Sequence, residues 1–277
     1  MNQQITTQGN LAKMQAELAD TVCYTLPLSD VRVALNPLIG MQLTLTHTGI
    51  INCIHCGRKT SKSFSQGYCY PCFITLAQCD MCIMKPETCH FDQGTCREPE
   101  WAQSHCMQPH VVYLANTSGL KVGITRKSQL PTRWIDQGAV QALPIIQANS
   151  RFQVGLIENE LKNHVSDRTS WQKMLKGDIA DIDLQHERDQ ILEKTHEALN
   201  QIGKRFGEQS WTILKEESIA IDYPIIEHPK KCKSFNFDKN KQVSGQLMGI
   251  KGQYLIFDGG VINIRKFGGY EVVVADV

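Results

Sequence analysis

HVVYLANTSGLKVGITRKSQLPTRW, residues 110–134, is the stretch that decides the fold we expect of this chain. Residues 111–114 are apolar, β-branched or aromatic and predict a strand. Residues 116–119 include asparagine, serine and glycine, which favour a turn, and residues 121–124 predict a second short strand. Pro131 suits the first turn of a helix. The stretch therefore predicts a β-hairpin followed by a helix.

The formal charge of this region is entirely positive. No acidic residue lies between Trp101 and Ile135. The basic residues of the same interval are Lys121, Arg126, Lys127 and Arg133. A hairpin and a helix that present only positive charge suit an anion such as a phosphate.

The order of these motifs carries a family resemblance. The chain reads Val-Tyr-Leu, then a turn, then Lys-Val-Gly-Ile-Thr, and then Arg-Trp entering a helix. This order resembles the core of the GIY-YIG nucleases. The resemblance covers roughly residues 110–175 and is closest to divergent branches that read Val-Tyr … Lys-Ile-Gly-Ile-Thr. More broadly, the chain resembles an uncharacterised bacterial family that pairs this core with an upstream cysteine-rich segment.

The GIY-YIG resemblance implies a catalytic site of four residues. The tyrosine that lies near the attacking water matches Tyr113, and the position of the second motif's tyrosine holds Lys121, which departs from the family. The arginine that contacts the scissile phosphate matches Arg133, after a gap longer than usual. The metal-binding glutamate matches Glu158, with Glu160 as the neighbouring alternative. Such a site would use Mg²⁺ or Mn²⁺.

Each of these residues has a chemical role that cleavage of a phosphodiester requires. The guanidinium of Arg133 can grip a phosphate and stabilise the charge that develops on it. Glu158 can hold a hard cation by one carboxylate, and Tyr113, helped by Lys121 or a water, can act as base. Each residue also has a structural interpretation. Tyr113 would then be a core residue of a strand, and Glu158 and Arg133 would be surface charges of helices.

Length and composition indicate a folded chain of about two domains. Its 277 residues are 42% hydrophobic and 21% charged, with a formal net charge of +1. The start, MNQQITTQGN, lacks the apolar core of a signal peptide, and no apolar run approaches the ~20 residues that span a bilayer. We expect a cytoplasmic protein without a membrane partner. Its eleven cysteines then favour metal binding over disulfides.

Two Cys-x-x-Cys pairs predict a zinc ribbon. Cys53 and Cys56 form the first pair, and Cys69 and Cys72 form the second, twelve residues further on. Each pair makes a tight loop that aims two thiolates at one point, so four thiolates can surround a tetrahedral zinc ion.

A second metal site is expected in the segment that follows. The ligands we choose are Cys79, Cys82, Cys89 and Cys96. Cys106, His90 or His110 could replace one of them. Zinc is the metal we favour, with an iron–sulfur cluster as the alternative for four thiolates. The chain would then carry two structural Zn²⁺ ions.

Basic residues near these motifs are candidates for contact with nucleic acid. No acidic residue lies between Asp30 and Asp80. The candidates are Arg58, Lys59 and Lys62 between the cysteine pairs, and Thr125, Arg126 and Lys127 after the hairpin. A purely structural zinc ribbon with solvated charges is the alternative.

The expected fold class is α+β. It combines a small GIY-YIG-like sheet with helices, a zinc-ribbon segment, and a β-rich domain formed by the two chain ends. The expected segments are an N-terminal β segment at 1–50, a zinc-binding segment at 51–108, a GIY-YIG-like domain at 109–206 and a C-terminal β segment at 207–277. Residues 178–206 show the clearest helical periodicity.

Three functions compete on this basis. The first is a zinc-containing nucleic-acid-binding protein that also cleaves phosphodiester bonds with a divalent metal. The second binds DNA, RNA or a ribosomal surface on a degenerate nuclease fold. The third is a zinc-scaffolded module for protein interaction. Nucleic acid is the partner we expect, and the sequence leaves DNA or RNA, and any protein partner, open.

Overall fold

The computed structural model describes residues 6–207 and 209–276, which form two compact units. The first unit runs to Ile74, resumes at Ile221 and includes Leu175–Gly177. The second unit comprises Thr75–Met174 and Asp178–Ala220. The fold is mixed α and β, and all of its named strands pair in antiparallel sheets.

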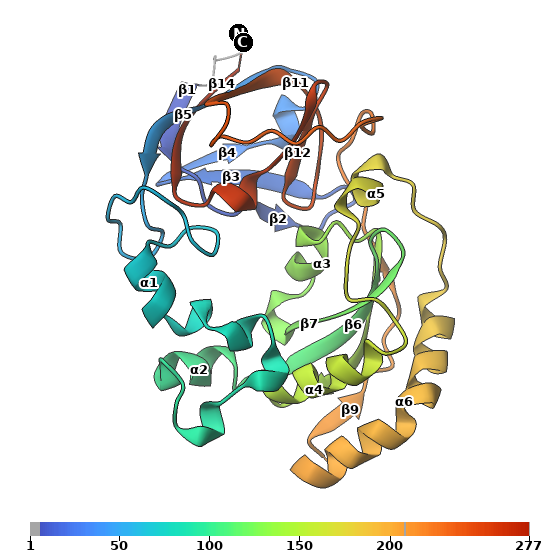
Figure 1. Cartoon of the computed structure of the whole chain (residues 1–277). Helices are drawn as coiled ribbons and strands as arrows, with labels where there is room; N and C mark the ends of the chain where they lie inside the picture. Colours follow the sequence, from blue (N-terminus) through green and yellow to red (C-terminus); the bar gives the residue numbers. More distant parts are fainter. Residues whose placement is uncertain (1–5, 208, 277) are drawn as a thin grey trace. The chain divides into compact units, whose positions relative to one another are not determined.

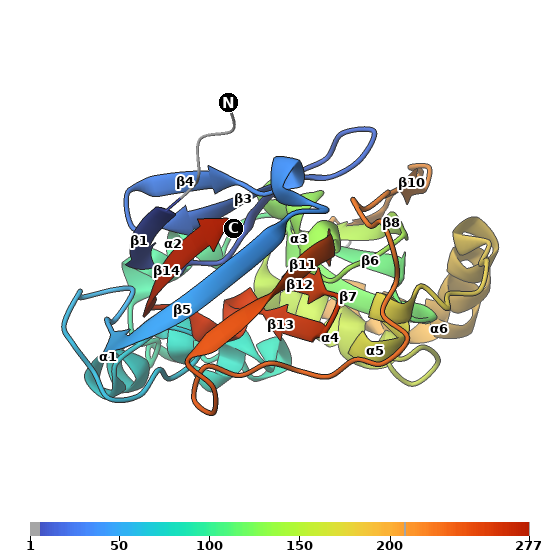
Figure 2. The same ribbon diagram turned by 90° about the horizontal axis from the view of Figure 1, so that it is seen from above.

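The first unit is built on a six-stranded sheet that contains strands from both ends of the chain (Figures 1 and 2). In spatial order these are β1 (Thr6–Asn10), β14 (Tyr270–Asp276), β5 (Gln42–Ile51), β11 (Gln242–Lys251), β12 (Tyr254–Phe257) and β13 (Gly260–Asn263). A smaller sheet has the order β2 (Gln15–Glu17), β3 (Cys23–Leu28) and β4 (Val31–Ala34). The central strand β5 pairs with β14 on one side and β11 on the other, so the segment before Cys53 is anchored on two C-terminal strands.

Alternation of buried and less buried residues explains why these segments form strands. In β14, Tyr270, Val272 and Val274 are buried, and the residues between them are partly exposed. Short helices complete the unit: η1 (Asn36–Leu38), α1 (Tyr70–Thr75) and η7 (Ile264–Phe267). One face of the sheet therefore supplies the core, as the period of two requires.

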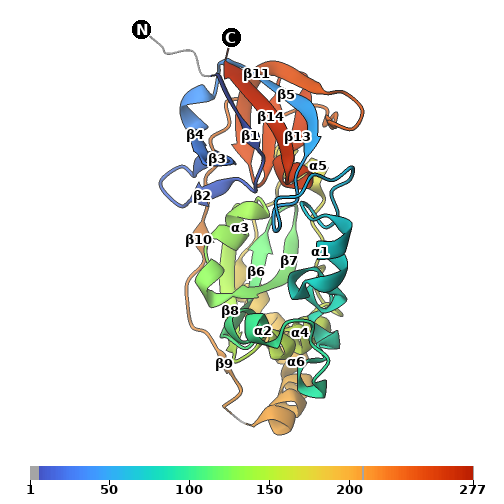
Figure 3. The same ribbon diagram turned by 90° about the vertical axis from the view of Figure 1, so that its left-hand side faces the viewer.

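The second unit contains the hairpin and a five-stranded sheet (Figure 3). Its strands are β6 (His110–Asn116), β7 (Leu120–Arg126), β8 (Gln141–Ala148), β9 (Trp211–Ile213) and β10 (Ile219–Ala220). The central strand β6 pairs with β7 and β8, β10 continues the sheet beyond β8, and β9 also pairs with β8. The predicted hairpin is therefore present, with residues 117–119 as its turn.

Helices complete the second unit. They are α2 (Pro99–His105), α3 (Thr132–Asp136), α4 (Arg151–Leu161), α5 (Trp171–Lys176, whose end passes into the first unit) and α6 (Leu184–Phe206). Five short 3-10 helices precede or join them: η2 (Ala77–Cys79), η3 (Met81–Ile83), η4 (Pro86–Thr88), η5 (Phe91–Gln93) and η6 (Lys127–Gln129). The apolar sides of α4 and α6 pack with strand residues such as Val112 and Ile146 into one core. Among the described residues, no helix is long and apolar enough to cross a membrane.

Several bounds differ from those we expected. The segment 51–108 is divided, because its first cysteine pairs belong to the first unit and residues from Thr75 onward belong to the second. The long helix begins at Leu184 rather than at residue 178, because the Asp183 carboxylate accepts hydrogen bonds from two backbone N–H groups at its start. Strands β1 and β2 lie within the N-terminal β segment that we expected, whereas strand β8 was not expected.

Candidate functional site

The four cysteines of the two Cys-x-x-Cys pairs come together where β5 ends and α1 begins. Cys53 and Cys56 follow β5 closely, Cys69 precedes α1, and Cys72 lies within it. Their four sulfur atoms all lie within 4.8 Å of one another, and the Cys56 and Cys69 sulfurs are 3.7 Å apart. With Zn–S bonds of about 2.3 Å, two sulfurs of a tetrahedral zinc site lie about 3.8 Å apart. The tetrad could therefore bind zinc with little rearrangement.

Tight backbone turns hold the sulfurs of this tetrad in place. The N–H of Gly57 donates to the Cys53 carbonyl at 2.9 Å, with Gly57 at φ +72°, where glycine is favoured. Burial acts to raise the pKa of the Cys53 thiol, but backbone N–H groups of Cys56, Cys69 and His55 lower that pKa to about 6. A thiol in such surroundings gives up its proton readily, as a metal ligand must.

The basic residues on the loop between the two cysteine pairs are all exposed. These are Arg58, Lys59 and Lys62. The Arg58 guanidinium hydrogen-bonds to the Cys56 sulfur, which raises the pKa of Arg58. The Lys62 ammonium lies 5.3 Å from the centre of the Phe64 ring. Arg58 thus offsets the charge of the thiolates, whereas Lys59 and Lys62 remain candidates for contact with a partner.

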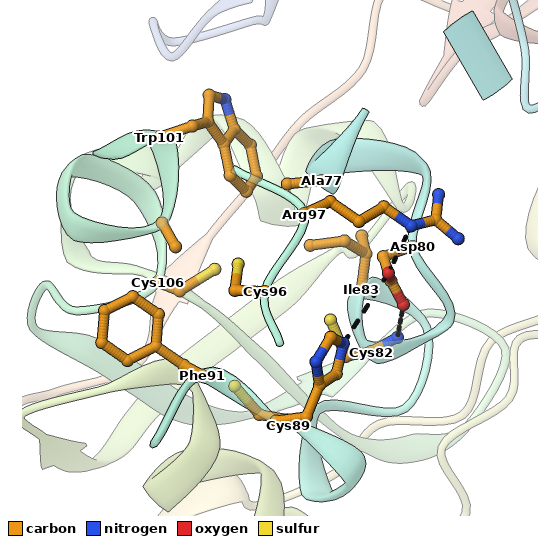
Figure 4. Close-up of a pocket in the computed structure, with 12 residues that line it drawn as sticks. Ala77, Asp80, Cys82, Ile83, Cys89, Phe91, Cys96, Arg97, Trp101 and Cys106 are labelled. Carbon is orange, nitrogen blue, oxygen red and sulfur yellow. Dashed lines mark hydrogen bonds and ion pairs between the residues drawn. The ribbon is translucent and has the colours of Figure 1, made fainter. Parts of the chain in front are cut away.

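A second group of cysteines lines one cavity of the second unit (Figure 4). Its members are Cys82, Cys89, Cys96 and Cys106. Cys79, which we expected to be a ligand, is not among the lining residues, and Cys106 is present instead. His90 also lines the cavity, whereas His110 does not. The His110 ring is fully buried at the start of β6, and burial lowers its pKa to about 4.

The carboxylate of Asp80 organises one wall of this cavity. It lies 2.6 Å from Arg97 Nε and 3.7 Å from His90 Nε2, and it accepts a hydrogen bond from the N–H of Cys82 at 3.3 Å. Asp80, Cys82 and His90 also place potential ligand atoms within 4.8 Å of one another. A cation bound there would meet the Arg97 guanidinium, so the ion pair disfavours a metal at this point.

Tyr113 lies at the centre of the hairpin unit and is fully buried. Val112 and Leu114 belong to the core that α4 and α6 cover, so Tyr113 points to the opposite face of β6. There its hydroxyl donates to Gln137 Oε1 at 2.7 Å, and its ring packs edge-on against Trp134 of α3. Burial raises the pKa of the hydroxyl. Tyr113 therefore packs on the face of β6 opposite to the core that α4 and α6 cover.

Gly123 faces Tyr113 across the hairpin. A Cβ atom at Gly123 would lie 2.6 Å from the Tyr113 hydroxyl oxygen and 2.7 Å from the ring carbon that carries it. The tyrosine ring therefore occupies the space that any side chain would need, which accounts for glycine in the Lys-Val-Gly-Ile-Thr motif.

The other expected catalytic residues are Lys121, Arg133 and Glu158. Each lies close enough to Tyr113 or to another of the three for its charge to shift a pKa. Lys121 is 5% exposed, and burial together with Arg133 lowers its pKa to about 8, while Glu158 acts in the opposite direction. The half-buried Arg133 also lowers the pKa of Tyr113, opposing the effect of burial. Glu158 is 8% exposed and lies 3.3 Å from Lys162 Nζ. Burial raises the pKa of Glu158, and Lys162 partly offsets that rise.

The end of β7 carries the remaining expected contacts. Thr125 is buried, Arg126 is half-buried and Lys127 is exposed. Arg126 and Lys127 line a surface groove. The other residues that line it are Ser104, Gln108, Pro109 and Ser128. The groove combines two cations with hydroxyl and amide groups, whereas the buried Thr125 serves packing.

Three residues of these sites were absent from our sequence analysis. Lys162 follows Glu158 by four positions on a helix, a spacing that suggests an ion pair and could have revealed it. Gln137 receives the Tyr113 hydrogen bond, and Arg151 donates to the Ile83 carbonyl at 2.6 Å. Neither contact has a local signal in the sequence, because each joins segments that only the tertiary fold brings together.

Comparison with known proteins identifies the chain at the level of family. No curated protein and no solved structure matches it significantly. Residues 40–272 match DUF2797, described as a protein of unknown function. The match spans both cysteine groups, the hairpin and most of the C-terminal strands. The chain therefore belongs to the DUF2797 family.

Proposed function

We propose that this protein binds nucleic acid through its phosphate backbone, at the groove next to the end of β7. The observation that carries the proposal is the pairing of Arg126 and Lys127 with uncharged donors in one groove. Cations, hydroxyls and amides are the groups that proteins use to hold phosphate oxygens. The interval from Trp101 to Ile135, which contains most of the groove, has no acidic residue that would repel a phosphate.

The charge balance near Tyr113 supports the same proposal. The cations whose charges affect one another there are Lys121, Arg133, Arg151 and Lys162. The carboxylates with the largest influence on them are Glu158 and Asp167. A surplus of positive charge in buried surroundings is relieved by an anion, and a phosphate approaching this part of the unit would be attracted.

The zinc ribbon adds a separate set of cations in the first unit. Lys59 and Lys62 are exposed on the loop that joins the two cysteine pairs. Zinc would stiffen this loop, since residues 51–74 contain few buried aliphatic side chains. In this proposal the metal has a structural role, and the two lysines extend the contact with nucleic acid.

Binding is tested by the anisotropy of labelled single- and double-stranded DNA and RNA, titrated with the full chain at several salt concentrations. Each phosphate contact contributes about 0.9 to the slope of log Kd against log salt on duplex DNA. Arg126→Ala/Lys127→Ala should therefore weaken binding and reduce this slope by about one to two. Lys194→Ala/Lys204→Ala removes the same charge from exposed positions of α6 and serves as the matched control.

Two results would reject the proposal. One is the absence of binding to all four nucleic acids at low salt, which would favour a module for protein interaction. The other is a reduction by the control pair as large as that by Arg126→Ala/Lys127→Ala, because the groove would then contribute only general charge.

Metal-dependent cleavage of phosphodiester bonds is a second candidate. It is favoured because the charges of Arg133 and Glu158 both act on the pKa of Tyr113. Tyr113 lies on β6, Arg133 on α3 and Glu158 on α4, which is the order that the GIY-YIG resemblance implies. Burial of Tyr113 and the Glu158–Lys162 pair work against it, since a metal and a phosphate must both gain access. Binding therefore ranks above cleavage.

Cleavage is tested on the same nucleic acids and on branched DNA with Mg²⁺ or Mn²⁺. An active site of this kind should lose at least a hundredfold in rate in Arg133→Ala, as is common when one charge-stabilising donor is removed. Glu158→Gln should abolish the metal-dependent cleavage, while Glu160→Gln serves as its control. A wild-type chain that binds but leaves every substrate intact would eliminate this candidate and retain the first.

A further inference from the structure

Four cysteine side chains of the second unit surround one space that the zinc ribbon does not involve (Figure 4). They are Cys82, Cys89, Cys96 and Cys106. Each comes from a different piece of chain: η3, the end of η4, the loop after η5, and the end of α2. Convergence of four cysteines from four segments on one cavity is the arrangement of a ligand site, since thiols spread at random over a surface have no reason to meet.

The spacing of these sulfurs differs from that of the zinc ribbon. In the ribbon all four sulfurs lie within 4.8 Å of one another. Within residues 6–207 and 209–276, Cys89, Cys96 and Cys106 do not form such a group. A single zinc ion needs sulfurs about 3.8 Å apart, so it would have to draw these side chains inward. The sulfurs of the second group are therefore more widely spaced than those of the ribbon.

The space that the four side chains line is about the size of one water. Its volume is about 20 Å³, and one water requires roughly 10–15 Å³.

The walls of the cavity are mainly apolar. Ile83, Phe91 and Trp101 form much of the lining, with two alanines, Ala77 and Ala102. Such walls exclude water from a metal–sulfur group and stabilise it against hydrolysis, since the hydrophobic shell of a metal site controls solvent access. The polar residues at the rim are Asp80, His90 and Arg97, which are already engaged with one another.

Positive charge and hydrogen bonds are available for an anionic group. Arg151 is close enough to Cys82, Cys89 and Cys106 for their charges to interact. Its guanidinium is fixed by the hydrogen bond to the Ile83 carbonyl. The backbone N–H of Phe91 donates to the Cys89 sulfur. Hydrogen bonds to ligand sulfurs and nearby charges are the means by which proteins stabilise iron–sulfur clusters.

The geometry points to an iron–sulfur cluster held by the thiolates of Cys82, Cys89, Cys96 and Cys106. Each thiol releases its proton to solvent and forms one sulfur–iron bond, and the inorganic sulfide and iron occupy the space between the four side chains. Tetrathiolate sites take either zinc or iron–sulfur clusters, and the wide spacing here selects the cluster.

The experiment measures iron, acid-labile sulfide and zinc in the full chain, produced and purified without oxygen. The wild type should contain iron and sulfide in equal amounts, two or four of each per chain, together with about one zinc in the ribbon. Mössbauer spectroscopy then distinguishes a two-iron from a four-iron cluster. This measurement needs no variant, so it decides the proposal even if a cysteine substitution prevents folding.

Variants assign the ligands. Cys106→Ser should remove most of the iron, sulfide and visible absorption, whereas Cys79→Ser, which changes the same atom outside the cavity, should keep them. Cys56→Ser should lose zinc and keep iron. The proposal is overturned by a wild type that holds two zinc ions and takes up no iron on reconstitution with ferrous iron and sulfide. It is also overturned if Cys79→Ser loses the cluster while Cys106→Ser retains it.

Discussion

Replacing Gly123 with alanine perturbs the centre of the hairpin unit by one methyl group. The added Cβ would lie 2.6 Å from the Tyr113 hydroxyl oxygen, about 0.8 Å short of the 3.4 Å at which ordinary contacts begin. Tyr113 has no exposed surface, and Trp134 and Gln137 confine its ring and hydroxyl. The ring can make room only by disturbing α3 or by giving up its hydrogen bond.

The expected cost of this substitution follows from those two responses. Overpacking of a closed core costs about 1–3 kcal/mol. Leaving a buried hydroxyl without its partner costs about 1–3 kcal/mol more. Gly123→Ala should therefore lower the free energy of unfolding of the second unit by about 1–3 kcal/mol if one response is enough and by about 2–6 kcal/mol if both occur. Adding Tyr113→Leu should recover part of the loss, because the atoms that the methyl group meets are then absent.

Urea unfolding followed by tryptophan fluorescence measures this change in the right part of the molecule. All four tryptophans, Trp101, Trp134, Trp171 and Trp211, belong to the second unit, so the signal is insensitive to unfolding of the first. Gly203→Ala is the control within the same unit. Its Cβ would meet Trp211 Nε1 at 3.4 Å, an ordinary contact, and alanine favours the interior of α6 by about 0.5–1 kcal/mol.

The two glycine variants should thus move the unfolding midpoint in opposite directions. If Gly123→Ala unfolds at the same urea concentration as the wild type, Tyr113 does not occupy the space over Gly123. The buried setting that we describe for the hairpin would then be incorrect. If the double variant is no more stable than Gly123→Ala, the cost comes from the backbone and the contact with Tyr113 is not its source.

Two further predictions concern the ribbon and the buried lysine. Cys72→Ser should lose about one zinc per chain by elemental analysis and lower the melting temperature seen by circular dichroism, whereas Cys23→Ser at an exposed site should change neither. The pKa of Lys121 is about 8 in the folded chain and about 10.4 in the unfolded chain. Holding this lysine charged therefore destabilises the fold, and the full cost is present below pH 8. The cost fades as the pH rises toward 10, because the folded lysine then loses its proton. Lys121→Met should therefore stabilise the second unit by roughly 1–3 kcal/mol at pH 7 and much less at pH 10, and equal effects at both pH values in tryptophan-monitored unfolding would contradict this account.

The hairpin could be predicted because its signals are local. The run Val111 to Leu114, the turn and the motif around Gly123 specify pairing between neighbouring segments, and Pro131 and Gly138 delimit α3 in the same way. Spacing likewise indicated the four cysteines that could bind zinc, since two tight Cys-x-x-Cys turns need only one long-range contact to meet. These features depend on residues that are close in the chain.

Strand β8 could not be predicted because it contains Pro144. Proline cannot donate to a ladder and argues against a strand that is paired on both sides. In the structure Pro144 lies opposite Tyr113 at a shift of register between β6 and β8, where the ladder is already irregular. The irregularity that accommodates the proline involves residues about thirty positions apart, and no pattern within either strand indicates it.

The cysteines that line the second cavity differ at one position from the ligands we expected, for a related reason. Cys79 and Cys82 have the same spacing as the pairs of the ribbon, but they lie on two separate short helices, η2 and η3, with Asp80 capping the second. The turn between them sends Cys82 into the cavity and leaves Cys79 outside it. Cys106 reaches the cavity only because α2 packs there. Spacing brings two cysteines to one point when a tight turn joins them, and a helix start between them can separate their side chains.

Helix α4 connects the two candidate sites of the second unit. Arg151 at its start lies beside the cysteine cavity, and Glu158, seven residues or two turns later, projects from the same face. The cysteine segment packs closely on this helix, since a Cβ at Gly155 would lie 2.7 Å from Pro86. The charges of Arg151 and Glu158 also affect each other. A substitution that loosens the cysteine segment should therefore also displace Glu158. The metal content of each variant has to be measured first, and only then can a change in nucleic-acid cleavage be attributed to residues of the hairpin.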